Sequence, residues 1–227
     1  DQPTALISPY PGAKLWAVMP LRNESGTSVV DSTAMADRLA AEIERVEGIG
    51  VLPVNRVLAE LDRAEFDSVN SVGEAMQLMH RLEVDGLIVG TISAWQPYEP
   101  PEIGASIQLY SRRSPDADPI DTRALSGAPT DEQVGLTNRY EQPVASVGGH
   151  FDAGNGTVLQ RLKDYAEGRT PPQSAAGWRR YLLSMDLYAR FVSHELTRRL
   201  LDAERDRLWR NADEPDAGRR DSAAAQQ

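Results

Sequence analysis

The stretch Asp85-Gly86-Leu87-Ile88-Val89-Gly90-Thr91-Ile92 decides the fold that the sequence predicts. An Asp-Gly turn leads into a short run of aliphatic and β-branched residues, which is typical of a central strand covered on both faces. Two further apolar runs, Leu15 to Met19 and Ile49 to Leu52, predict short strands. From Ile103 to Tyr110 apolar and polar residues alternate, which predicts a strand with one buried face. These four strands, with helices between them, indicate an α/β unit.

Helices are predicted in the gaps between these strands. The first begins at Asp31 or Ser32, both competent caps, and Gly48 is placed to end it. Its apolar stripe consists of Met35, Leu39, Ile43 and Val46. Asn55 is predicted to cap a brief second helix, and Ser71 to Glu74 matches a capping box that opens a third. The inner face of that third helix is predicted to hold Val72, Ala75, Met76, Met79 and Leu82. The predicted fold is therefore α/β, a three-layer sandwich with a mixed sheet.

The C-terminal half predicts one long helix and much irregular chain. The helix runs from about Ala175 to Trp209, and Ile120 to Leu125 could add an edge strand. The stripe of that helix is Trp178, Tyr181, Leu182, Met185, Tyr188, Val192, Leu196 and Leu200. The predicted organisation is an N-terminal tether (1–12), an α/β domain (13–127), an irregular excursion (128–155), C-terminal helices packing on the domain (156–210) and a disordered tail (211–227).

Composition excludes several classes of function. The 227 residues include 34 Asp and Glu against 24 Lys and Arg, so the net charge is −10, and there is no cysteine. An acidic chain is not expected to grip nucleic acid or an anionic membrane through charge. No apolar run approaches the roughly 20 residues of a membrane-spanning helix. The missing cysteines exclude disulfides, thiolate metal sites and cysteine nucleophiles.

Catalytic and cofactor motifs fail at specific positions. His194-Glu195 begins like the HExxH zinc motif, but Arg198 stands where the second histidine belongs. Ser25-Gly26-Thr27 lies where a phosphate loop would lie, but the spacing and the lysine of such a loop are absent. No GxSxG nucleophile elbow occurs. We therefore expect no catalytic residue, no cofactor and no metal site, and hence no enzyme.

The segment Trp95-Gln96-Pro97-Tyr98-Glu99-Pro100-Pro101 is the most suggestive surface. Prolines stiffen a loop, and Trp95 and Tyr98 can bury large areas at low entropic cost when a partner docks. The alternative is that both rings fold back onto the long C-terminal helix. The turn that begins with Asn23 and Glu24 is a weaker second candidate. The candidate interaction residues are therefore these four, with acidic side chains steering a basic partner.

The first 110 residues resemble the CsgG, LpoB and TolB amino-terminal group of bacterial envelope proteins. The matching segments, in order, are Leu15 to Leu21, Arg22 to Gly26, the helix near Asp31, Val51 to Leu58, Asp85 to Ile92 and Ile103 to Tyr110. In the C-terminal helix, Gly177 to Leu182 and His194 to Leu196 are similar to uncharacterised lipoprotein-like proteins of planctomycete type.

The resemblance implies an exported, non-catalytic protein, periplasmic or outer-membrane-associated, that binds other envelope proteins. The chain starts at Asp1 without an initiator methionine, which is consistent with a removed export signal ending in a lipidated cysteine. Residues 112–150 lack the alternating segments of membrane β-hairpins, which argues against a secretion pore. Two alternatives stay open. One is a ligand-binding or enzymatic domain using the crevice at the strand carboxyl ends. The other is a subunit of a homo-oligomeric, secretion-associated ring with the long helix as its interface.

Overall fold

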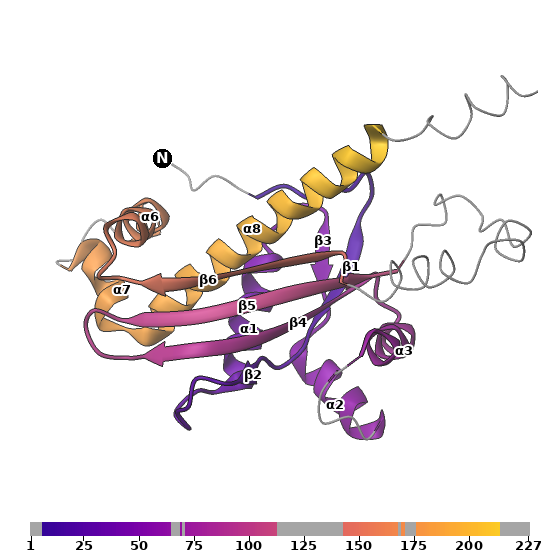
Figure 1. Cartoon of the computed structure of the whole chain (residues 1–227), viewed down its shortest axis with the longest axis horizontal. Helices are drawn as coiled ribbons and strands as arrows, with labels where there is room; N and C mark the ends of the chain where they lie inside the picture. The colour runs from indigo at the N-terminus through magenta and orange to yellow at the C-terminus, as the bar shows by residue number, and fades with distance from the viewer. Residues whose placement is uncertain are drawn as a thin grey trace, which may run out of the picture.

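A computed structural model describes residues 6–64, 69, 71–112, 143–167, 169–170 and 176–213. Residues 211–213 are described by their backbone alone. One six-stranded sheet forms its centre, in the order β3-β1-β4-β5-β6, with β2 beside β4 (Figure 1). The strands are β1 Lys14–Val18, β2 Arg22–Asn23, β3 Ile49–Val51, β4 Gly86–Gln96, β5 Glu102–Ser111 and β6 Ala145–Asp152. The helices are α1 Ser32–Ile43, α2 Val54–Ala64, α3 Val72–Leu82, α6 Gly156–Ala166, the short 3₁₀ turn η1 Gly177–Arg179, α7 Arg180–Leu183 and α8 Met185–Asp213.

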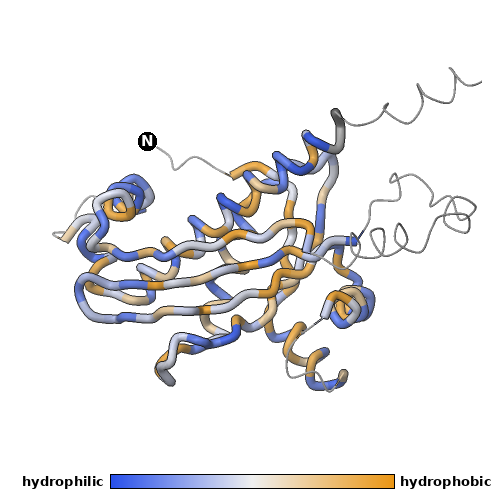
Figure 2. The backbone as a smooth tube through the Cα atoms, viewed as in Figure 1, coloured by the Kyte–Doolittle hydropathy of each residue, from blue (hydrophilic) through white to orange (hydrophobic). Residues whose placement is uncertain are grey.

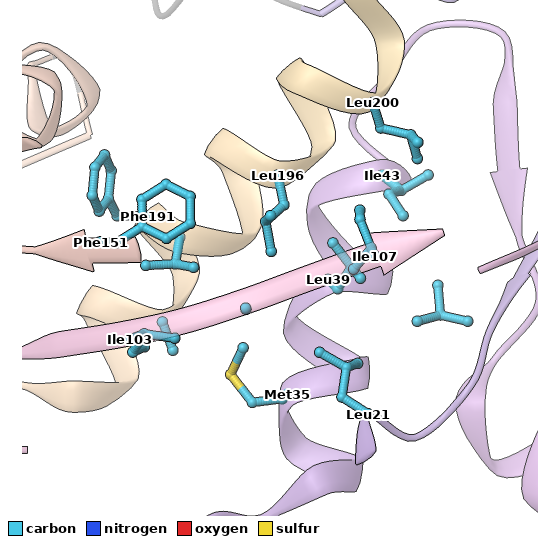
Figure 3. Packing of buried hydrophobic residues seen from close by; sticks show 14 of the residues in the cluster. Leu21, Met35, Leu39, Ile43, Ile103, Ile107, Phe151, Phe191, Leu196 and Leu200 are labelled. Carbon is cyan, nitrogen blue, oxygen red and sulfur yellow. The ribbon is translucent and has the colours of Figure 1, made fainter. Parts of the chain in front are cut away.

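The sheet is mixed and lies between two layers of helices. β1 runs parallel to β3 and β4, and β2 runs parallel to β4, whereas the β4–β5 and β5–β6 pairs are antiparallel. One buried cluster joins the sheet to α1, α6 and α8, and a smaller one joins its other face to α2 and α3. Figure 3 shows side chains of α1 and α8 meeting Ile103 and Ile107 of β5. The predicted three-layer fold with a mixed sheet and a long C-terminal helix is confirmed.

Two of the predicted helix starts are confirmed by their caps. The Oδ1 atom of Asp31 accepts a hydrogen bond from the backbone N–H of Ala34 at 2.9 Å. Ser71 Oγ accepts one from the N–H of Glu74 at 3.2 Å. Each cap satisfies a backbone donor that the first turn of a helix leaves without an intrahelical partner. Asn55 is different: it lies inside α2, which already begins at Val54, so the predicted cap is wrong.

The inner face of α3 also differs in part from the prediction. Ala75, Leu78, Met79 and Leu82 are buried, whereas Met76 is exposed and Val72 is half-buried. The helix is rotated so that Leu78 rather than Met76 faces the sheet. When apolar residues lie at both borders of a helix's buried face, the sequence does not fix which border points to the core.

The predicted single helix from Ala175 to Trp209 is wrong in its first part. Gly177–Arg179 forms a 3₁₀ turn and α7 ends at Leu183. Ser184 has extended backbone angles (φ −131°, ψ 111°). Its Oγ accepts a hydrogen bond from Leu187 N–H, and its carbonyl accepts one from Tyr188 N–H. Ser184 therefore caps α8, and the apolar spacing runs across the break because both helices pack on the same core.

β6 lies within residues 128–155, where the sequence indicates an irregular excursion. The strand pairs with β5 from Glu102↔Asp152 to Leu109↔Ala145. Gly148 and Gly149 interrupt the apolar pattern, which removes the usual signal of a strand. Tertiary contacts hold the strand: Arg199 of α8 donates a hydrogen bond to the Gly148 carbonyl at 2.7 Å. The suggested edge strand at 120–125 and most of the predicted tail lie outside the described residues.

Residues 6–12, expected to form a tether with residues 1–5, pack against the domain. Ile7 forms a parallel bridge with Glu47. The hydroxyl of Tyr10 donates to the fully buried carboxylate of Glu204 at 2.6 Å, and its ring meets Trp16 edge-on at 5.9 Å. The described start of the chain is therefore fixed to both β1 and α8.

We predict that Gly86→Ala destabilises the fold by about 1–3 kcal/mol, because a larger group in a packed core forces its neighbours to move. Gly86 pairs with Trp16, and a Cβ there would lie 2.7 Å from the indole Cδ1 and 3.1 Å from Leu109 Cδ1. Urea unfolding measures the change. Gly156→Ala is the matched control, because nothing lies within 4 Å of its Cβ position at the start of α6. Equal stability of Gly86→Ala and the unmodified chain would contradict the packing.

Candidate functional site

A β-bulge decides where Trp95 points. Ile92 pairs with Ala105, but Ala94 pairs with Gly104, so Ser93 is one extra residue on β4. An extra residue reverses the face to which the following side chains point. Trp95 therefore lies opposite Ile103, on the face that carries α8, and packs half-buried against the larger core cluster. The strand continues to Gln96, so the first two residues of the Trp95 to Pro101 segment belong to β4 and only the rest forms the connection to β5.

Tyr98 has the opposite environment. It lies in the connection between β4 and β5, and 75% of its surface is exposed. The end of this connection is hydrogen-bonded to the segment after β6, since Ala153 N–H donates to the Pro101 carbonyl at 3.0 Å. An aromatic ring is thus presented on a stiff, supported segment.

The turn after β2 meets the same end of the sheet. Asn23 pairs with Ile92 of β4, and Glu24 N–H donates to the Ile92 carbonyl at 2.8 Å. Three residues farther along β4 is Trp95. The turn after β2, some 70 residues away in the sequence, therefore lies beside β4 on the approach to the end of the β4–β5 hairpin (Figure 1). No motif in the sequence signals this, because β2 has only two residues.

Asn23 and Glu24 have different roles in that turn. Asn23 Oδ1 accepts hydrogen bonds from the N–H and hydroxyl of Ser25, and Nδ2 donates to the Thr27 carbonyl at 2.7 Å. Asn23 thus shapes the turn. Glu24 is exposed and lies 3.5 Å from Arg22, and Val29 just beyond the turn is exposed as well. We call Glu24, Val29, Trp95 and Tyr98 the hairpin-end surface.

Buried titratable groups join α1 to α6 and α8. Glu42, 4% exposed, receives hydrogen bonds from Arg45 Nη1 at 2.8 Å and the Tyr165 hydroxyl at 3.2 Å, and His194 Nδ1 lies 3.4 Å away. Burial opposes ionisation, but the contacts with His194 and Arg45 outweigh it and hold the Glu42 pKa below its usual value. Burial raises the pKa of Tyr165, so its hydroxyl stays protonated. Every member has a partner inside the core, which is the arrangement of a structural network.

Two cavities open beside the parallel strands. The larger, of about 520 Å³, lies beyond the carboxyl end of β1, between the sheet and α2. The smaller, of about 440 Å³, lies between α1 and α2 beside β3. The larger cavity lies where the alternative ligand site is predicted from the sequence, at the carboxyl ends of the parallel strands.

The described part of the chain contains no helix long and apolar enough to cross a membrane. Within residues 6–64, 69, 71–112, 143–167, 169–170 and 176–213, no group of three or more His, Asp or Glu side chains is arranged to hold a metal ion.

Among solved structures, several resemble this chain at low similarity. No family model and no curated protein matches it. The LpoB C-terminal domain from Salmonella enterica is 10% identical over 62% of this chain and 84% of that one, with a TM-score of 0.40. The PelC dodecamer from Paraburkholderia phytofirmans in space group P6 is 12% identical over 88% and 94%, with a TM-score of 0.41. Lipoprotein GNA1162 from Neisseria meningitidis is 14% identical over 71% and 99%, with a TM-score of 0.42. Likenesses at this level do not establish a shared function or partner.

We predict that the ionised Glu42 stabilises the fold above about pH 4.5 and that this contribution is lost as the pH falls through the lowered folded-state pKa. The free energy of unfolding of the unmodified chain should therefore fall more steeply below pH 4.5 than that of Glu42→Gln. Urea titrations at about pH 7 and about pH 3.5 measure both slopes. Glu44→Gln, an exposed carboxyl at the end of the same helix, should keep the unmodified slope. Identical slopes for Glu42→Gln and the unmodified chain would contradict the prediction.

Proposed function

We propose that the protein is a non-enzymatic module that binds another protein of the cell envelope through the hairpin-end surface. One observation supports the proposal: β2 pairs with β4 just before the bulge, so the turn at Asn23 and Glu24 lies beside the strand that leads to the exposed Tyr98. Exposed aromatic residues on rigid elements are the usual anchors of protein interfaces, because little entropy is lost when they dock.

Charge suggests the kind of partner. Glu99, next to Tyr98, and Glu24, beside β4, are both exposed, and the whole chain carries a net charge of −10. Complementary charge mainly speeds the encounter of two proteins and selects the partner. The proposed partner therefore presents a basic rim around an apolar pocket for the Tyr98 ring.

The proposed location rests on the family resemblance of residues 15–26 and 85–110. We propose that the protein is exported and held at the periplasmic or outer-membrane side, with a lipid anchor upstream of Asp1. Fractionation of cells that express the full gene tests this directly. Recovery of the protein in the cytosol alone would overturn the location and with it the envelope partner.

Two alternative roles extend from the sequence analysis. The cavity at the end of β1 favours binding of a small ligand, which is compatible with binding of a protein partner. A homo-oligomeric ring with α8 as its interface is the other role. Light scattering on the purified full chain separates a ring from a monomer.

We predict that Tyr98→Ala abolishes capture of the partner and leaves stability within about 0.5 kcal/mol, because an exposed side chain makes few contacts within its own chain. The measurement is photo-crosslinking in cells, followed by identification of what co-purifies with the tagged full chain. One envelope protein in stoichiometric yield is expected for the unmodified chain, and its loss for the variant.

Trp209→Ala is the matched control, since Trp209 is also aromatic and 71% exposed but lies near the far end of α8. It should keep the partner. Trp95→Ala is a poorer test of binding, because Trp95 packs against the core and its removal lowers stability as well. Equal capture by the Tyr98→Ala and Trp209→Ala chains rules the hairpin-end surface out as the docking site.

A further inference from the structure

The larger cavity lies where the order of the strands reverses. From β1 the chain crosses to β3 on one side, and from β3 it returns through α2 and α3 to β4 on the other side of β1. The gap between the carboxyl ends of β1 and β4 is therefore a topological switch point. In open α/β sheets such gaps are where small ligands bind, because the connecting segments part there toward opposite faces.

The register of the strands sets which side chains form its floor. Directly paired residues of neighbouring strands point to the same face of a sheet. Arg22 pairs with Thr91, and Val89 pairs with Gln108, so these four lie on the face that carries α2 and α3. Tyr110, opposite the buried Leu87, lies on that face too. A two-residue strand thus aims Arg22 toward the cavity and Asn23 away from it.

The walls combine apolar and polar surface in about equal measure. Met19, Pro20 and Leu21 follow β1 on one side, and Leu61 of α2 and Val69 stand on the other. The volume of about 520 Å³ is within the range of small-molecule sites, which combine apolar walls with a few placed polar groups. The cavity therefore suits a ligand that has both an apolar part and a polar end.

The polar groups of the cavity are mostly donors. Among the described residues that line it, Arg22 is the charged one, in a chain with ten more acidic than basic residues. Burial raises the Tyr110 pKa and keeps the phenol protonated, and its hydroxyl donates to Gln108 Oε1 at 3.2 Å. The amide nitrogen of Gln108 is then the part of that side chain left to donate to a ligand. A guanidinium and an amide N–H beside apolar walls match a carboxylate with an apolar body.

We propose that this cavity binds a small organic carboxylate with an apolar body, whose carboxylate pairs with Arg22 and whose apolar part lies against Met19, Leu61 and Val89. The side chain of Arg22 is 52% exposed, so it stands at the mouth of the cavity and meets the charged end of a ligand while the apolar end lies deeper. Binding of such a ligand does not require the proposed envelope partner.

Octanoate is the probe, titrated calorimetrically into the purified full chain, with octanol and octylammonium as neutral and cationic comparators. We expect octanoate to bind with a Kd below about 1 mM and the cation not to bind. Arg22→Gln should weaken octanoate at least about tenfold, as expected for loss of a charged hydrogen bond. Arg190→Gln is the matched control: its side chain is 51% exposed and pairs with Asp186, far from the cavity. It should leave the affinity unchanged.

Methyl resonances locate the ligand. In a chain with ¹³C-methyl methionine, octanoate should shift the Met19 signal and leave that of Met185 in place, since Met19 lines the cavity and Met185 packs on the opposite face of the sheet. Thr91→Phe should fill the cavity and abolish the shift. Val89→Phe serves the same purpose if Thr91→Phe does not fold. The proposal is overturned if octanoate does not bind, if octylammonium binds as tightly, if Arg22→Gln has no effect, or if Met185 shifts instead of Met19.

Discussion

The structure depends on the double pairing of β4. Along one edge β4 meets first β1 and then β2, both parallel, and along the other edge it meets β5, antiparallel. Its residues Leu87, Ile88 and Ile92 have no exposed surface, because helices cover both faces of its first half. Gly90 lies at the crowded point: a Cβ there would be 2.9 Å from the Ser106 carbonyl oxygen and 3.0 Å from Ile107 Cγ2. Both candidate sites depend on this one strand, since Val89 to Thr91 line the larger cavity and Tyr98 follows its end.

The bulge at Ser93 divides β4 into a core half and a surface half. A side chain at Gly104, opposite the bulge, would crowd it, since a Cβ there would lie 2.7 Å from Ser93 Oγ and 3.1 Å from the backbone nitrogen of Ala94. By turning Trp95 toward the face that carries α8, the bulge packs the end of β4 onto the core, and Tyr98 is exposed in the connection that follows. Bulges next to binding sites commonly serve to re-aim a side chain in this way. Trp95 and Tyr98, both predicted from the sequence as interaction residues, therefore differ: Trp95 packs on the core and Tyr98 is exposed.

The sequence predicts well those elements whose signal is local. The β4 run, the caps Asp31 and Ser71, and the α1 stripe from Met35 to Ile43 all follow from residues near one another in the chain and are confirmed. The predicted end of that helix at Gly48 is wrong: α1 ends at Ile43, and Val46, the last residue of the predicted stripe, is buried beyond it. It fails where distant residues decide. β6 carries two adjacent glycines and is held by Arg199, whose Nη1 occupies the place where a Gly149 Cβ would stand. The break at Ser184 is hidden because α7 and α8 share one apolar face.

The candidate site shows the same limit more sharply. The four residues were chosen from the sequence for their chemistry. What brings Asn23 and Glu24 beside the second half of β4 is a two-residue strand that no periodicity reveals. That strand also links the two proposed sites. Its alternation sends Arg22 toward the cavity, while Glu24, 3.5 Å from Arg22, belongs to the hairpin-end surface. A carboxylate bound to Arg22 would compete with Glu24 for the same guanidinium, and any coupling between ligand and partner must be reciprocal. Through the short strand β2, binding at one site can therefore change the affinity of the other site.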